Sequence, residues 1–157
     1  IAPMTIGANG VKRYSALDYA TIWSNNLTLK YTLNTHWNWL TQLNYNLGKD
    51  NQQNNLPFMS PLGYTSTISF QQNDWNASFA VKGNATQTNF NSSYGEDETP
   101  SYAILDASVG KKLNWSNSKI QMNFGVENIL DAHYSTYTDW NNLPRMGRNF
   151  FINITLR

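Results

Sequence analysis

Residues 75–86 read WNASFAVKGNAT, and apolar side chains alternate with polar or small ones along this stretch. Trp75, Phe79 and Val81 fall on one set of alternate positions, with alanine or glycine at the others, and the second set is polar or small throughout. Successive side chains of a β-strand point to opposite faces of the sheet. The stretch therefore predicts a strand with one apolar and one polar face.

The same alternation recurs at residues 37–48, 119–127 and 150–157, and helical periodicity is hard to find. We predict seven strands, at residues 12–32, 37–48, 61–71, 75–87, 101–113, 119–128 and 145–157. All are longer than the roughly 5 to 6 residues that are usual in soluble proteins. A strand that crosses a bilayer at a tilt needs about 9 to 11 residues, so the lengths favour membrane-spanning strands.

The composition excludes several classes of protein. The 157 residues carry 11 Lys and Arg against 10 Asp and Glu, and a formal net charge of +1 argues against a nucleic-acid binder. Only 13% of the residues are charged while 14% are aromatic, which favours a β-protein that touches an apolar medium. The absence of cysteine excludes a disulfide framework, a cysteine zinc site and a thiol nucleophile. No apolar run approaches the roughly 18 residues of a transmembrane helix.

The predicted connections alternate between short and long. Short connections fall at 33–36, 72–74 and 114–118, and long ones at about 49–60, 88–100 and 130–144. Short turns on one side and long loops on the other are typical of an outer-membrane barrel. Large aromatic residues gather at the short-turn ends, where a membrane-interface girdle is expected. These residues are Trp37, Trp39, Phe70, Trp75 and Trp115.

Seven strands cannot close a bacterial barrel, because such barrels have an even number of strands and no fewer than about eight. An open edge in lipid would leave backbone groups unpaired, which costs several kcal/mol for each group. We therefore predict an all-β, antiparallel up-and-down transmembrane barrel of which residues 1–157 form the C-terminal part. Residues 1–11 would be the end of a preceding outer loop. The opening Ile1-Ala2-Pro3-Met4 has no signal-peptide pattern, which we interpret as a piece of a longer protein.

The last third of the chain resembles the TonB-dependent outer-membrane receptors. Tyr102–Leu113 looks like the strand before their last hairpin, Phe124–Tyr134 resembles their G-V-x-N-L-x-D-x-x-Y motif, and Pro144–Phe151 resembles the P-x-x-G-R-x-F motif that opens the final strand. Leu56-Pro57 with Pro61 and the stretch 14–22 are also similar, although Ser24 stands where a glycine is usual. The family commonly ends on an aromatic residue, whereas this sequence ends on Arg157, and we expect one aromatic residue to follow.

The resemblance implies the last third of a barrel of about 22 strands, with an N-terminal plug domain and earlier strands outside these residues. It implies location in the bacterial outer membrane and import of a scarce nutrient, driven by the TonB–ExbB–ExbD system. Iron chelates, haem, cobalamins, metal ions and glycans stay open as substrates. Lipid and lipopolysaccharide would surround the wall, and the inward Lys82, Lys119 and Glu127 could contact the plug. The resemblance implies neither a resident cofactor nor an enzymatic activity.

Loops carried by a rigid scaffold often bind ligands. We predict ligand contacts in the loop 132–143, at His133, Tyr134, Tyr137, Asp139 and Trp140. A second outer loop adds Phe90 and Tyr94, beside the acidic residues Glu96, Asp97 and Glu98.

The motif residues have structural interpretations. We expect Asn128 and Asp131 to cap the strand-to-loop turn and Gly147 to allow an unusual backbone angle or a close approach. Pro144 and Phe150 open the last strand. Arg145 and Arg148 could pair with lipopolysaccharide phosphates, with Asp131 and Asp139, or with an anionic ligand.

Other functions have weaker support. His36 and His133 are far apart in the sequence; Met59 and Met146 could both lie near the outer surface, where thioethers suit Cu(I), but no ligand spacing supports a metal site. His133 has Asp131 and Ser135 nearby, which is not a catalytic triad. Two other folds remain open: a small complete barrel acting as an adhesin or enzyme, which needs an eighth strand hidden in 1–11 or a split of 12–32, and a soluble β-sandwich lectin.

Overall fold

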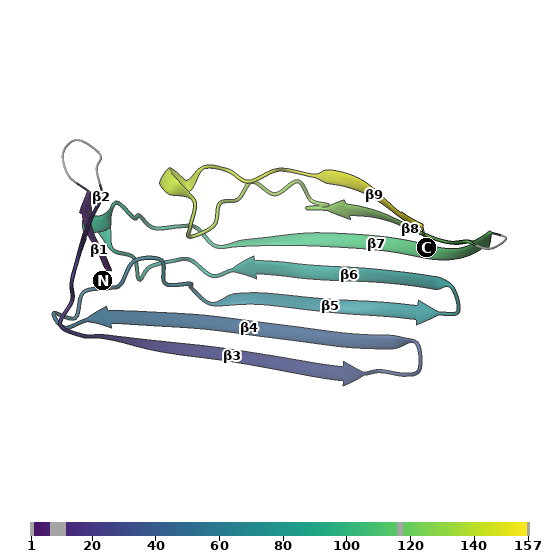
Figure 1. Cartoon of the computed structure of the whole chain (residues 1–157), viewed down its shortest axis with the longest axis horizontal. Coiled ribbons are helices and arrows are strands. Elements are labelled where there is room, and N and C mark those ends of the chain that lie inside the picture. The colour runs from purple at the N-terminus through teal and green to yellow at the C-terminus, as the bar shows by residue number, and fades with distance from the viewer. Residues whose placement is uncertain (1, 7–11, 116–117, 157) are drawn as a thin grey trace.

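The computed structural model describes residues 2–6, 12–115 and 118–156. Seven strands form one antiparallel sheet in which each strand pairs with its neighbours in sequence, as Figure 1 shows. The strands are β3 (Ala20–Thr32), β4 (Trp37–Asp50), β5 (Gly63–Gln72), β6 (Trp75–Asn84), β7 (Tyr102–Trp115), β8 (Ser118–Glu127) and β9 (Asn149–Leu156). The predicted all-β, up-and-down fold is confirmed.

The short turns lie at one end of the sheet, which we call the turn end, and the long loops at the other, which we call the loop end (Figure 1). Turn residues explain the tight connections. The Asn34 side chain accepts hydrogen bonds from the backbone N–H groups of His36 and Trp37 at 2.9 and 3.1 Å. Asn73 has a φ of 50°, which asparagine tolerates better than most residues. Strands joined in this way can only pair as antiparallel hairpins.

The register places the apolar positions that were predicted in residues 37–48, 75–86, 119–127 and 150–157 on one face of the sheet. Directly opposed residues share a face, and one row runs through Ile68, Phe79, Ala107, Val126 and Phe150. The adjacent row on the other face contains Ser69, Ser78, Ser108, Gly125 and Phe151. At Gly125 any Cβ would collide with the Phe151 ring, so glycine makes room for an aromatic side chain on this mainly polar face.

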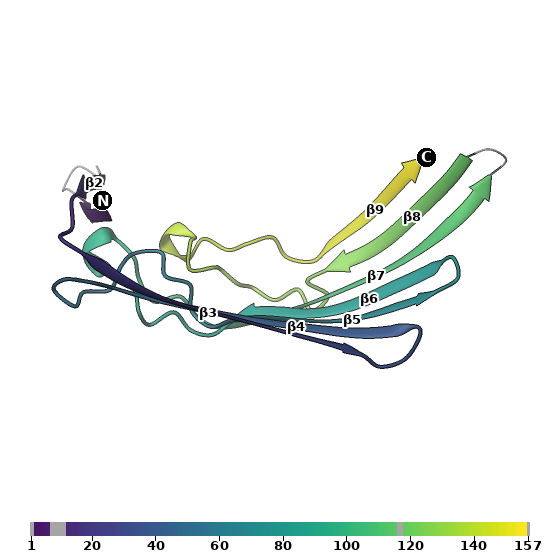
Figure 2. The same ribbon diagram turned by 60° about the horizontal axis from the view of Figure 1, so that its bottom comes forward.

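The sheet is strongly curved (Figure 2). The β8–β9 loop lies on the concave side in this view and lines a hollow together with Asn44, Lys82 and Asn84 of the polar face. The polar face is therefore concave and the apolar face convex. Large side chains on the convex face stay uncovered: Phe150 is 72% exposed and Ile152 63%. Apolar patches of this extent mark a surface that meets lipid or protein.

Several predicted boundaries were wrong. The first predicted strand, 12–32, is two strands, β2 (Lys12–Ser15) and β3, because residues 16–19 between them are not in a strand. The two strands belong to different sheets. Within 1–11, predicted as a loop, residues 2–6 form strand β1 (Ala2–Ile6). Residues 85–87 and 145–148, predicted as strand, lie in loops. Contacts with the long loops hold the backbone there: the Ala85 N–H donates to the Leu62 carbonyl at 2.8 Å, and Asp131 accepts the Arg148 N–H at 2.7 Å. Alternation within the sequence does not report such contacts.

The β1–β2 hairpin does not supply an eighth wall strand. The two strands pair only with each other, in a separate two-stranded sheet, and they cross the loop end of the large sheet (Figure 1). In the described part of the chain no second sheet covers the convex face, so the lectin architecture is not supported.

None of the helices among the described residues has the length and apolarity to cross a membrane.

Aromatic side chains form a band on the convex face near the turn end. The Trp37 and Phe70 rings lie 4.9 Å apart between centroids, and the Lys111 ammonium lies 4.5 Å from the Trp75 ring centroid. Trp39 Nε1 donates to Ser66 Oγ at 2.8 Å, which satisfies both polar groups on an apolar surface. The side chain of Trp115, the remaining member of the predicted girdle, lies outside the described residues.

Neighbouring residues of β6 test which face meets lipid. In the full-length protein, Phe79→Arg should destabilise the barrel by about 2 to 4 kcal/mol, because it places a charge on the convex face near mid-strand. Ala80→Arg is the matched control; it should be tolerated because residue 80 is on the concave face, opposite Asp106. Heat-modifiable migration of outer-membrane extracts measures both. Equal tolerance of the two substitutions would contradict the assignment of faces.

Candidate functional site: the loop end of the sheet

Three long loops gather at the loop end: the β4–β5 loop (51–62), the β6–β7 loop (85–101) and the β8–β9 loop (128–148). Two contain a short 3₁₀ helix, η1 (Ser92–Tyr94) and η2 (Trp140–Asn142). These loops contain the ligand residues expected from the sequence, and their mutual contacts decide which of those residues lie together.

The β4–β5 and β6–β7 loops are held together by polar contacts. The Glu96 carboxylate accepts one backbone N–H from each loop, Phe58 at 2.7 Å and Asn91 at 2.8 Å. The amides of Asn55 and Asn91 donate to the backbone of the opposite loop, and Gln87 Nε2 donates to the Met59 carbonyl. Because hydrogen bonds to a carboxylate are stronger than neutral ones, Glu96 is the centre of a two-loop unit.

The motif residues close the neck of the β8–β9 loop. Asn128, with a φ of 51°, is buried, and its side chain both donates to and accepts from the backbone of Ala132. Asp131 accepts the backbone N–H of Arg148 at 2.7 Å, and Arg148 Nε donates to the Ile129 carbonyl at 2.8 Å. A Cβ on Gly147 would lie 2.5 Å from Asp131 Oδ1, so Gly147 serves a close approach. The two ends of the loop are thus bonded to each other.

An ion pair orders the distal part of the same loop. Arg145 Nε lies 2.7 Å from Asp139 Oδ2, and this oxygen also accepts hydrogen bonds from the backbone and hydroxyl of Thr136. Burial alone would raise the pKa of Asp139, but the hydrogen bonds from Arg145 and Thr136 hold that pKa below its ordinary value of 3.8. Of the predicted partners for Arg145, the loop carboxylate Asp139 is the one in contact.

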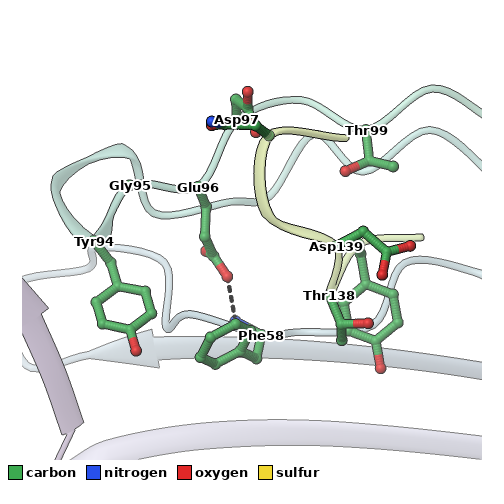
Figure 3. Close-up of a pocket in the computed structure, with 10 residues that line it drawn as sticks. Phe58, Tyr94, Gly95, Glu96, Asp97, Thr99, Thr138 and Asp139 are labelled. Atoms are coloured by element: carbon green, nitrogen blue, oxygen red, sulfur yellow. Dashed lines mark hydrogen bonds between the residues drawn. The ribbon is translucent and has the colours of Figure 1, made fainter. Parts of the chain in front are cut away.

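A small hollow lies where the three loops meet (Figure 3). Its wall includes the aromatic residues Phe58, Tyr94 and Tyr137, with Asp139 and Thr99 beside them. Phe58 has a φ of 60°, an unusual conformation for a bulky residue, and its ring meets Tyr94 edge-on at 5.3 Å. The hollow is only about 30 Å³, enough for one or two water molecules. In this conformation it cannot hold a nutrient molecule.

A wider hollow of about 210 Å³ lies on the concave side, beneath the β8–β9 loop. We call it the concave-face hollow. The Tyr102 and Tyr134 rings lie 4.6 Å apart at its edge, and Lys82 forms an ion pair with Asp106 at 2.7 Å. Its remaining polar lining comes from Asn44, Thr65, Asn84, Thr136 and Arg145. Both cations are paired with carboxylates, so the hollow offers flat aromatic surface, amides and hydroxyls with little net charge.

The predicted ligand residues are divided among three hollows. Tyr94, Tyr137 and Asp139 line the small hollow and Tyr134 the concave-face hollow. Phe90 lines a third depression of about 460 Å³ between the β4–β5 and β6–β7 loops. His133 is exposed and lines none of the three. The side chain of Trp140 lies outside the described residues.

Sequence reasoning missed Phe58 and Tyr102. Phe58 reaches the site through its positive φ and its bond to Glu96, which no local pattern signals. Tyr102 is the first residue of β7 and belongs to its inward-facing set, opposite Asn84. The alternation of the predicted strand 101–113 already placed Tyr102 on the inward face next to an outer loop, and this position could have identified it from the sequence.

Metal-binding residues do not cluster. The described residues contain no group of three His, Cys, Asp or Glu side chains suited to a metal ion. Met59 packs at Gly48, and Met146 is 72% exposed. The arrangement does not support the thioether site that the two methionines suggested.

Comparison with known proteins identifies the family. The family model of the TonB-dependent receptor-like β-barrel matches residues 3–129. The chain belongs to the TonB-dependent receptor family. No curated protein matches its sequence. Among solved structures, the copper transporter OprC superimposes with a TM-score of 0.79 and 20% identity over 86% of this chain. The chain spans 23% of that transporter's length. At this identity the likeness shows the shared fold, a partial barrel of this family.

The Asp139–Arg145 ion pair predicts how the loop responds to pH. A carboxyl group whose pKa is lowered by folding stabilises the folded state above its unfolded pKa, and this contribution is lost as pH falls through the folded value. The β8–β9 loop should stay ordered at pH 7 and 5 and loosen only below about pH 3.8. Electron paramagnetic resonance of a nitroxide on Leu143→Cys, in the full-length protein, measures this mobility.

Asp139→Asn should raise the mobility at pH 7 and remove most of its pH dependence. Asp97→Asn, which changes an exposed carboxylate of the β6–β7 loop, is the control and should behave like the parent. A loop that loosens already near pH 6 would point to another titrating group.

Proposed function

We propose that this chain is part of the wall and outer mouth of a transporter that imports a scarce nutrient across the bacterial outer membrane. The supporting observation is the pair of faces: a convex, mainly apolar face that extends over seven strands, and a concave, mainly polar face suited to line a lumen. Family membership supports energy supply through TonB, ExbB and ExbD. The loop end would face the outside, next to lipopolysaccharide, and the turn end the periplasm.

The complete protein would contain further strands and a plug domain. The free edges of β3 and β9 would each pair with another strand, because unpaired backbone groups in lipid are costly. A barrel of about 22 strands would contain the present seven as roughly its last third. The plug would occupy the concave side, and its N-terminal extension would contact TonB.

We propose the concave-face hollow as a nutrient contact. Its two ion pairs, Lys82–Asp106 and Arg145–Asp139, leave little net charge, so recognition would depend on stacking against Tyr102 and Tyr134 and on hydrogen bonds to amides. Such a surface suits a ring-bearing chelate, a tetrapyrrole or a glycan better than a bare metal ion. OprC is named a copper transporter; within the described part of this chain no group of three His, Cys, Asp or Glu side chains is placed to hold a metal ion.

Uptake measurements test the transport proposal. Cells of the parent organism that lack the full-length gene should fail to accumulate one member of a panel of labelled ferric chelates, haem, cobalamin and oligosaccharides. Deletion of the tonB gene should cause the same loss, and a plasmid copy of the receptor should restore uptake only in cells that have TonB. Uptake that persists in cells without TonB would contradict the proposal of TonB-driven import.

Neighbouring loop residues test the proposed contact. Tyr134→Ala in the full-length receptor should weaken binding of the transported nutrient at least about fivefold, because aromatic contacts of this kind contribute on the order of 1 kcal/mol. Tyr134→Phe should retain most of the affinity. His133→Ala is the matched control and should change binding little, because His133 lines none of the hollows. Isothermal titration calorimetry measures the affinity of all three variants. A larger loss of affinity for His133→Ala than for Tyr134→Ala would contradict a nutrient contact on the concave face.

A further inference from the structure

An apolar depression of about 400 Å³ lies where β7, β8 and β9 pair with one another. We call it the convex-face depression, because six of its lining residues belong to the convex set: Ala107, Val109, Phe124, Val126, Phe150 and Ile152. Ala107 stands between Phe79 of β6 and Val126 of β8. The small side chain of alanine leaves a low point among larger apolar ones.

A lysine stands on the turn-end side of this depression. Lys111 is the next convex residue of β7 after Val109, about 7 Å further along the strand. It pairs with Trp75, and its ammonium lies 4.5 Å from the Trp75 ring centroid. Lys111 therefore belongs to the aromatic band near the turn end and adjoins the depression directly.

Lys111 has no carboxylate partner among the residues that the structure describes, where the ion pairs are Lys82–Asp106 and Arg145–Asp139. Asp74, in the β5–β6 turn, lines a depression on the concave face together with Lys112 and Lys119. The residue opposite Lys111 on β8 is the apolar Met122. The convex face thus offers a cation at one end of an apolar surface.

We propose that Lys111 and the convex-face depression together bind one glycerophospholipid of the periplasmic leaflet, with the phosphate against Lys111 and an acyl chain in the depression. This rests on the proposed function, which places the turn end on the periplasmic side of an outer membrane. A lysine near the membrane surface attracts an anionic headgroup, and an apolar lining favours a hydrocarbon chain. The indole N–H of Trp75 is a further donor for oxygen atoms of the headgroup.

The spacing of the two parts suits a lipid. Ala107 lies four residues from Lys111, which is about 13 Å along an extended strand and less in depth, because barrel strands tilt by about 35 to 45°. One leaflet contributes half of a hydrocarbon core of about 30 Å. A chain that begins at a phosphate beside Lys111 therefore reaches the depression before the middle of the bilayer. A lipid of the outer leaflet would have its headgroup at the loop end, away from Lys111.

Selectivity distinguishes such a site from general contact between the wall and lipid. A purely apolar surface accepts acyl chains of any lipid, whereas a cation beside the chain favours lipids that carry a phosphate. The proposal therefore predicts that the phosphate and the chain are recognised by different residues, and that each contribution can be removed separately.

Native mass spectrometry of the full-length receptor in detergent tests the contribution of the phosphate. The probes are dioleoylphosphatidylglycerol and dioleoylglycerol, which lacks the phosphate. Lys111→Gln should weaken phosphatidylglycerol binding about fivefold, the effect expected for one lysine near the membrane surface, and leave dioleoylglycerol binding unchanged. Lys112→Gln is the matched control, because it removes the charge of the next residue on the opposite face; it should bind both probes like the parent.

Filling the depression tests the contribution of the chain. Ala107→Leu should weaken the binding of both probes several-fold, because the larger side chain occupies the low point. Ala103→Leu is the matched control, since Ala103 lies on the same strand and face but outside the depression; it should bind like the parent. Heat-modifiable migration shows that each variant forms a barrel before its affinity is compared.

Retention of the parent's phosphatidylglycerol affinity by either Lys111→Gln or Ala107→Leu would overturn the proposal. A receptor dimer that Ala107→Leu dissociates would also overturn it, because a second copy would then occupy the depression. Nutrient uptake is measured in the same cells. TonB-dependent uptake by a receptor without this lipid selectivity would refute the lipid site alone, whereas TonB-independent uptake would refute the proposed function.

Discussion

Backbone hydrogen bonding is the constraint on which the structure depends. In a hydrocarbon layer no water can satisfy an unpaired N–H or C=O group, and every spanning strand must therefore bond to a neighbour on each side. The continuous ladder from β3 to β9 meets this requirement for the five inner strands. Once the backbone is satisfied in this way, side chains are free to sort by face, and alternate residues sort into lipid-facing and lumen-facing sets.

The same constraint explains why the loops are built differently. Beyond the membrane the backbone can bond to water, so loop order has to come from specific side chains. Glu96 joins two loops by accepting N–H groups from both, and Asp131 and Asp139 perform similar roles at the neck and the distal part of the third. Each of these carboxylates is used for structure. Asp139, which the sequence predicted as a ligand contact, and Glu96 are therefore occupied, whereas Asp97 and Glu98 are exposed.

The sequence predicted the repeating part of the molecule well and the irregular part poorly. Alternation in stretches such as 75–86 repeats every two residues, and it placed Phe79, Phe124 and Ile152 on the correct common face. The split at residues 16–19 and the early end of β6 at Asn84 arise from contacts with distant loops, so no local period reports them. Phe58 shows the limit for the site: its position depends on a positive φ and on Glu96, 38 residues away.

The distribution of charge differs between the two ends of the concave face. At the loop end, Lys82 and Arg145 are each paired with a carboxylate, so the concave-face hollow that they line has little net charge. At the turn end, Lys112 and Lys119 form no ion pair within the described part of the chain. Lys82, Asp106, Lys112 and Lys119 owe their common face to the register of β6, β7 and β8, whereas Asp139 and Arg145 are placed by the β8–β9 loop.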